Sequence, residues 1–123
     1  TDRKDEWLWT MMILQPDIIT EALVLEANEQ VKQKKKFNPL AQLRFESFHE
    51  GKAAQILHIG PFSEEGPTVE RLHQFIAKQE YTLRGKHHEI YLSDTRRAAP
   101  ENWKTIIRQP IAQKALKKKN ASA

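Results

Sequence analysis

The sequence predicts an α+β fold, in which an antiparallel sheet carries helices packed on one face. Two amphipathic helical patterns alternate with short runs rich in branched and aromatic residues, which predicts the element order β-α-β-β-α-β-β. The Glu-Gly pair at residues 50–51 separates two of these runs, as in a tight hairpin, and a hairpin imposes antiparallel pairing. With 123 residues, the chain is one domain or part of one, long enough to enclose a hydrophobic core.

The first expected strand covers residues 7–15, WLWTMMILQ, which are apolar almost throughout. A continuous apolar run of this kind is typical of a strand buried on both faces. The next element is predicted to be an amphipathic helix with Thr20 as its N-cap. Its apolar face is defined by Leu23, Ala27 and Val31, which recur at spacings of four.

Five further elements follow from residue 43 onward, one of which is the strand expected within residues 85–94. The arms of the hairpin are expected over residues 43–50 and 52–60. A second helix is expected to begin at Pro67, because the first helical position needs no N–H donor. The last strand, residues 103–109, should stop at Pro110. The residues that the second helix is expected to bury are Val69, Leu72, Phe75 and Ile76.

The stretch GKHHEIYLSD, residues 85–94, contains a strand with a carboxylate in an unusual place. Successive side chains on a strand point to opposite faces, so His87, Glu89 and Tyr91 share one face. Glutamate is a poor strand former. Glu89 therefore either faces water or lines a cavity, and Tyr91 either donates a hydrogen bond there or only fills the wall.

An internal repeat relates two segments that both begin with Trp and end with Pro. WTMMILQP, residues 9–16, and WKTIIRQP, residues 103–110, align without gaps and share Trp, Ile, Gln and Pro. A hairpin, a helix and a strand are expected before the second copy, whereas almost nothing precedes the first. If the two copies are equivalent strands of a duplicated unit, the upstream half of the first unit is not in this chain.

The net charge of +4 comes largely from two basic runs, residues 32–36 and 114–119. The first falls where a helix should end, where cations are favourable. The second belongs to residues 112–123, which are expected to be a basic disordered tail. This distribution favours solvated charge over a nucleic-acid site, and we expect no nucleic-acid partner.

Composition excludes several classes of protein. The chain has no cysteine, which fits a reducing cytoplasm, and no apolar run approaches the ~20 residues of a membrane span. The absence of an initial Met indicates that the chain is processed or is part of a longer one. We expect a cytoplasmic location and no membrane partner.

No cofactor and no metal are predicted, because the chain lacks a glycine-rich phosphate-binding loop and its histidines show no zinc-site spacing. His58 stands among apolar neighbours, which favours a core histidine over a catalytic one. We nevertheless keep it among the residues expected to line a ligand cavity. The histidines considered were His49, His58, His73, His87 and His88.

Three segments in the second half of the chain resemble one protein family. RFESFHEGKAAQILHIGPFSEEGPTVERLHQFI, residues 44–76, is followed by LRGKHHEIYLSD, residues 83–94, and by a strand that ends in RQP. Together they resemble the GyrI-like small-molecule-binding proteins, and within them the stand-alone bacterial group that includes cyclopropanoid cyclopropyl hydrolases. The resemblance covers residues 7–111.

The resemblance implies a duplicated strand–helix–strand–strand architecture, as in effector-binding domains, with sheets curving around a central cavity. Residues 1–111 then correspond to the C-terminal part of such a domain: the last strand of module one, a linking helix and module two. Because half of a pseudo-symmetric unit exposes a sheet edge, we expect a homodimer in which a second copy takes the place of the missing module.

The resemblance also implies a function for the cavity. Glu89 matches the family's cavity glutamate, and as a general base it would open strained cyclopropane-bearing genotoxins by hydrolysis. The alternatives are a non-catalytic module that binds or sequesters amphiphilic small molecules, with Glu89 as a counter-ion, and a gyrase-inhibitor-like role in protein interaction. Whether the chain is an enzyme stays open at this point. The residues expected to wall the ligand, besides His58, are Tyr91, Trp9, Trp103 and Trp7.

Overall fold

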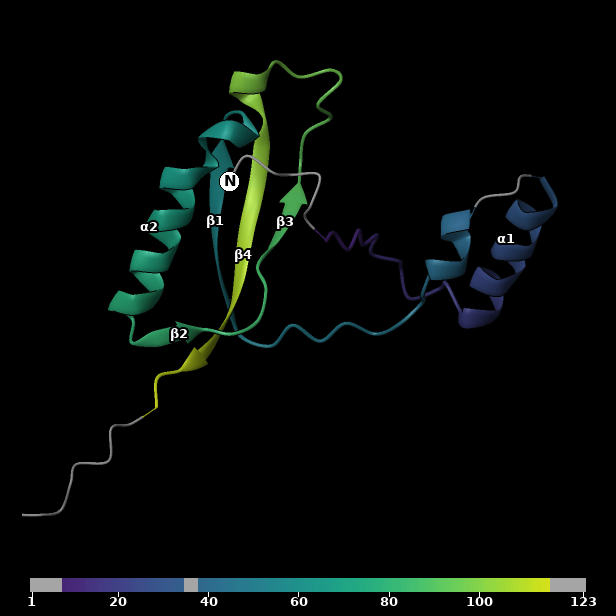
Figure 1. Cartoon of the computed structure of the whole chain (residues 1–123), viewed down its shortest axis with the longest axis horizontal. Helices are drawn as coiled ribbons and strands as arrows, with labels where there is room; N and C mark the ends of the chain where they lie inside the picture. Colours follow the sequence, from purple (N-terminus) through teal and green to yellow (C-terminus); the bar gives the residue numbers. More distant parts are fainter. Residues whose placement is uncertain (1–7, 35–37, 116–123) are drawn as a thin grey trace, which may run out of the picture. The chain divides into compact units, whose positions relative to one another are not determined.

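The computed structural model describes residues 8–34 and 38–115, and the chain divides into two compact units (Figure 1). The first unit comprises residues 1–47 and the second residues 48–123. Trp7 and most of the predicted basic tail lie outside the described residues. We describe each unit by itself.

The first unit contains helix α1, Glu21–Lys34, and a short 3-10 helix η2, Asn38–Gln42. Thr20 is the N-cap of α1, as predicted, because the Oγ1 of Thr20 accepts a hydrogen bond of 3.3 Å from the N–H of Leu23. The apolar residues Leu23 and Val31 remain 46% and 41% exposed. The helix therefore forms where its pattern predicts, but its apolar face is not buried within the described residues.

Residues 8–15 are extended but belong to no sheet in the described part of the chain, which differs from the predicted strand. Leu8, Met11 and Leu14 are each more than 90% exposed. A strand buried on both faces needs hydrogen-bonding neighbours and covering layers, and the described residues supply neither to this segment. Residues 43–49 likewise form no hairpin arm, so the ladder begins after Gly51, at Ala53.

The second unit is organised around one long strand, β4, Lys104–Gln113 (Figure 1). Strand β1, Ala53–Ile59, runs antiparallel along one edge of β4. Strands β3, His88–Tyr91, and β2, Tyr81–Leu83, pair with successive parts of its other edge, also antiparallel. Three strands thus share one hydrogen-bonding partner.

Helix α2, Glu65–Lys78, packs on one face of this sheet and completes the core. The register of β1 and β4 places Ala54, Ile56 and His58 opposite Gln109, Ile107 and Thr105, all on the side of the helix. The α+β class and the antiparallel sheet with a helix on one face are confirmed. The buried hydrophobic residues are Ala54, Leu72, Ile76, Ile107 and Ile111.

Three details of this unit differ from the prediction. Helix α2 begins at Glu65, so Pro67 lies inside its first turn, where a missing N–H costs no helical bond. Its Phe75 is 55% exposed rather than buried. Strand β4 continues through Pro110, because that residue lies opposite the first residue of β1 and the N–H of Ile111 resumes the ladder at 2.9 Å from the Lys52 carbonyl.

The core predicts how stability depends on two isoleucines of the same sheet. Ile107 is fully buried between β4 and α2, whereas Ile59 of β1 is 58% exposed. Ile107→Ala should lower the free energy of unfolding by about 2–5 kcal/mol, because it removes buried methyl groups and leaves a cavity. Ile59→Ala, the matched control, should cost less than about 1 kcal/mol. Denaturant titration followed by circular dichroism measures both, and equal losses would contradict this account of the core.

Candidate functional site

Strand β3 presents Glu89 and Tyr91 on the face of the sheet that α2 also covers. Glu89 lies opposite Ile107 of β4, and Tyr91 lies opposite Thr105, and both partners face the helix side. The hydroxyl of Tyr91 donates a hydrogen bond of 2.8 Å to Oε2 of Glu89. Glu89 is partly buried. It is therefore not a solvated strand carboxylate, and Tyr91 does more than fill space.

A row of aromatic rings continues from this pair. Phe62, in the 3-10 helix η3, Phe62–Glu64, meets the ring of Tyr91 at 5.4 Å between centroids, edge to face. On its other side Phe62 lies 4.9 Å from Trp103, at an interplanar angle of 35°. Trp103 is oriented by its indole N–H, which donates to the Ala98 carbonyl at 2.9 Å. The structure therefore brings Trp103, through Phe62, into one row with Tyr91 and Glu89, and the roles of these residues at a ligand stay predictions.

Phe62 was missed by the sequence analysis, although it is the ring that joins the other two. It follows Gly60 and Pro61 in a segment that reads as a loop. Gly60 has φ +134°, a conformation that side chains disfavour, and this turn delivers the ring to the sheet face. An aromatic residue just after a Gly-Pro turn was the available signal.

His58 is a structural residue rather than a wall of the site. It is 5% exposed, and both ring nitrogens are engaged. Nε2 lies 3.1 Å from the Pro61 carbonyl, which can only accept, so Nε2 carries the proton of the neutral ring. Nδ1 then accepts from the Thr68 hydroxyl at 2.7 Å. His58 thus ties β1 to the turn that carries Phe62 and to α2.

The surroundings of the Glu89–Tyr91 pair change the pKa of the Tyr91 phenol. Partial burial and the hydrogen bond to Glu89 raise the pKa of Tyr91 well above its usual value, and the charges of Glu89 and Glu65 add to this. Tyr91 therefore stays protonated and serves as a hydrogen-bond donor at any physiological pH. The folded state holds the phenolic proton of Tyr91 more tightly than the unfolded chain does. The stabilisation that this gives is complete below about pH 10, the ordinary pKa of tyrosine, and is lost progressively as the pH rises from there through the folded-state pKa.

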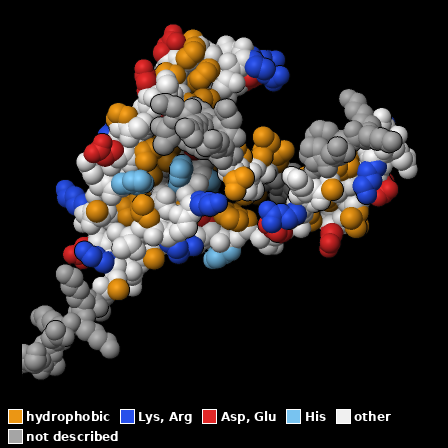
Figure 2. Space-filling view, viewed as in Figure 1, with side chains coloured by type: hydrophobic (Ala, Val, Ile, Leu, Met, Phe, Trp, Pro, Cys, Tyr) orange, Lys and Arg blue, Asp and Glu red, His pale blue; other side chains and the backbone are white. Residues whose placement is uncertain are grey.

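The site is a surface rather than an enclosed chamber within the described residues. Tyr91 is 56% exposed, and Phe62 and Trp103 are partly buried. Figure 2 shows exposed hydrophobic side chains beside histidines and charged groups on one face of the molecule. Trp9 lies in the first unit, and its role at the ligand stays a prediction, as does that of Trp7.

The described residues contain no group of three or more His, Asp or Glu side chains arranged to hold a metal ion. They also contain no helix with the length and hydropathy required to cross a membrane.

The phenol–carboxylate pair gives a direct test. Glu89→Gln should lower the pKa of Tyr91 toward about 10, because the amide carries no negative charge next to the phenolate. The ¹³Cζ signals of the chain's two tyrosines can be titrated by NMR at alkaline pH. Glu70→Gln, an exposed carboxylate on α2, is the control and should leave the titration of Tyr91 unchanged. An unchanged Tyr91 pKa in Glu89→Gln would contradict the assigned contact.

Solved structures from Listeria innocua resemble this chain closely. One described as a hydrolase is 40% identical with a TM-score of 0.71, and 80% of this chain matches 52% of that chain. One described as an uncharacterised conserved protein is 42% identical with a TM-score of 0.73, over 80% of this chain and 50% of that chain. A further hydrolase is 40% identical with a TM-score of 0.70, over the same shares. The present chain thus spans about half the length of these relatives.

A search of curated proteins found no significant match. The model of the GyrI-like small molecule binding domain, in contrast, matches residues 17–112, which include both α-helices, all of the sheet except the last residue of β4, and the Glu89–Tyr91 pair. The chain belongs to the GyrI-like small-molecule-binding family.

Proposed function

We propose that the chain binds amphiphilic, polycyclic small molecules on the surface formed by Glu89, Tyr91, Phe62 and Trp103. The observation that carries this proposal is the 2.8 Å hydrogen bond from Tyr91 to Glu89, set at the end of a row of contacting rings. A carboxylate held beside aromatic rings offers a flat ligand an apolar wall and a fixed charge. Family membership supports a small molecule as the partner.

The charge of the site favours ligands with a positive group. Glu89 and Glu65 both act on Tyr91, so the local field on that phenol is negative. A ligand cation would be attracted by these carboxylates and by the ring faces, and cation–π contacts contribute about 0.5–2 kcal/mol each. The aromatic row would hold the rest of the ligand by stacking.

The binding proposal predicts a charge-selective loss in Glu89→Gln. Affinity for ethidium, a planar aromatic cation, should fall about two- to tenfold, because a partly exposed carboxylate contributes a modest electrostatic attraction. Affinity for an uncharged polycyclic aromatic probe should change much less. Fluorescence titration measures both, with Glu70→Gln as the control. Equal affinities of the wild type and Glu89→Gln for ethidium would rule out Glu89 as the charged group of the site.

A second candidate function is hydrolysis of strained cyclopropanes, and it is supported by the similarity to two Listeria proteins described as hydrolases. In this reaction Oε1 or Oε2 of Glu89 takes a proton from water. The water oxygen bonds to a ring carbon, the strained C–C bond breaks, and its electron pair passes to the conjugated acceptor group of the substrate. That group then takes up a proton, from Glu89 or through solvent, which restores the carboxylate. General-base assistance of this kind contributes about 10² to 10⁴ in rate. Tyr91 would orient the carboxylate or donate to a substrate carbonyl.

Hydrolysis predicts a ring-opened product that is heavier by one water. Incubation of the chain with a cyclopropane-containing DNA alkylator, followed by mass spectrometry, should show this product above the uncatalysed background. Glu89→Gln should abolish the excess while it still binds the alkylator. If the wild-type chain gives no excess product, it is not a hydrolase of such compounds, and the binding proposal is judged on the ethidium titration alone.

We further propose that a second copy of the chain completes the site. Within the described residues β3 pairs only with β4, so its outer edge, next to Glu89 and Tyr91, carries unpaired backbone groups. The chain also spans about half the length of its solved relatives. Sedimentation velocity at rising concentration should show a dimer. A monomer throughout the micromolar range would contradict this arrangement.

A further inference from the structure

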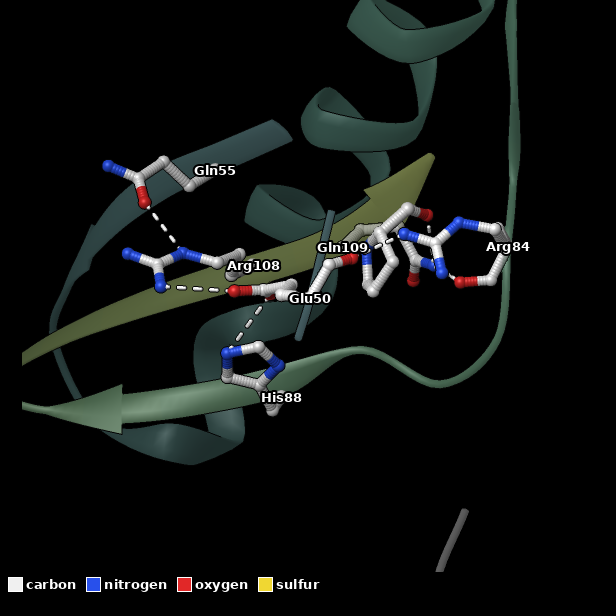
Figure 3. Close-up of polar contacts among 7 residues, drawn as sticks. Glu50, Gln55, Arg84, His88, Arg108 and Gln109 are labelled. Atoms are coloured by element: carbon white, nitrogen blue, oxygen red, sulfur yellow. Dashed lines mark hydrogen bonds and ion pairs between the residues drawn. The ribbon is translucent and has the colours of Figure 1, made fainter. Parts of the chain in front are cut away.

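A polar network occupies the face of the sheet opposite α2 (Figure 3). The register places Gln55 of β1, Arg108 of β4 and His88 of β3 in one row across the strands. Nε of Arg108 donates to Oε1 of Gln55 at 2.9 Å. This row joins the sheet's two outer strands through β4, and neither the proposed binding surface nor the core includes it.

Glu50 closes this row from outside the sheet. Its Oε2 lies 3.3 Å from Nη1 of Arg108, and its Oε1 lies 3.2 Å from Nε2 of His88. The Glu50 side chain is only 17% exposed and that of His88 only 20%. Oε1 is buried without an aligned hydrogen bond, so its contact with His88 is essentially electrostatic. A carboxylate this deeply placed depends on the cationic guanidinium of Arg108 and on its contact with His88.

The backbone of Glu50 is fixed as well. Nη2 of Arg84, in the connection between β2 and β3, donates to the Glu50 carbonyl, and Nε of the same side chain donates to the Ile111 carbonyl at 3.3 Å. The next residue, Gly51, has φ +72°, which turns the chain into β1. Glu50 is therefore held at both its backbone and its carboxylate.

The contact with His88 bears directly on the proposed site. His88 and Glu89 are consecutive residues of β3, and alternation sends them to opposite faces of the sheet. Strand β3 has only four residues and, within the described chain, one strand neighbour. The anchor of its first residue, His88, therefore limits how far Glu89 and Tyr91 can move.

We propose that Glu50 is a positioning residue for the Glu89–Tyr91 surface, acting through His88 from the opposite face of the sheet. The proposal rests on the proposed function for its effect on ligands, but the immobilisation of β3 stands apart from it. The charged groups that meet His88 and its partner are Glu50 before β1, Arg108 of β4 and Arg84 at the Glu50 carbonyl.

Amide hydrogen exchange of residues 88–91 tests the immobilisation without any ligand. Glu50→Gln should lower the protection of the β3 amides about tenfold, since it removes a buried charge contact at one end of a short edge strand. Amides of β1 residues 54–58 should keep their protection. Glu46→Gln is the matched control, because Glu46 makes only an exposed 3.9 Å contact with Arg44. A uniform loss over the whole sheet, or no loss in β3, would overturn the proposal.

A double-variant comparison separates positioning from general destabilisation. His88→Gln should lower the protection of the β3 amides as Glu50→Gln does, and the double variant should lose no more than either single one. If Glu50→Gln does not fold, His88→Gln alone decides. Additive losses in the double variant would contradict the contact between Glu50 and His88.

Ethidium titration then links the network to the site. Glu50→Gln should weaken ethidium binding severalfold although Glu50 lies on the other face, whereas Glu46→Gln should not. If the wild type does not bind ethidium at all, the proposed function fails for this probe, and the exchange data still decide whether Glu50 holds β3. Unchanged binding together with lost β3 protection would confine Glu50 to a structural role and overturn its positioning of the site.

Discussion

The second unit depends on the hydrogen bonding of β4. Strands β1, β2 and β3 each pair with this strand, and within the described residues no ladder joins them to one another. Because successive side chains of β4 point to opposite faces of the sheet, the register of this strand determines which residues lie on each face. Thr105, Ile107, Gln109 and Ile111 face α2 and are buried, while Arg108 on the other face collects the polar network. Core, binding surface and network are thus three consequences of one strand's register.

This arrangement explains how a carboxylate can be partly buried on an edge strand. Glu89 and Tyr91 of β3 lie opposite Ile107 and Thr105, so they are on the helix side of the sheet. Helix α2 itself packs over β1 and β2. Glu89 and Tyr91 therefore lie beside the helix rather than beneath it, where Phe62 and Trp103 shelter them. Partial burial and the hydrogen bond between the two side chains together keep the phenol protonated.

Local pattern was enough to predict what depends on neighbours in the sequence. Thr20 as a cap, Leu72 and Ile76 as core residues, and the shared face of Glu89 and Tyr91 all follow from periodicity and alternation. The fold class followed from the same signals. Strand alternation singled out Glu89 but left open whether it faces water or a cavity, and the resemblance favoured the cavity.

What escaped prediction depends on tertiary contacts. Phe62 reaches the site because His58 and Gly60 shape a turn, and no periodicity marks that. The sequence pattern assigned Glu50 to a hairpin turn, whereas in the structure its carboxylate contacts the side chains of residues 88 and 108. Residues 8–15 have the composition of a buried strand, but burial requires neighbours that the described residues do not provide.

The position of β4 in the chain has a consequence for folding. All three partners of β4 precede it in the sequence, and β1 lies roughly fifty residues upstream. None of these pairings can therefore form before β4 has been synthesised, and the pairing with β1 joins segments that are far apart in the sequence. During synthesis the apolar, uncharged strand AAQILHI emerges well before anything that can pair with it. Until β4 leaves the ribosome, α2 has no complete sheet to cover. The unit should therefore fold after its translation rather than during it, and the waiting segments are natural targets for chaperones.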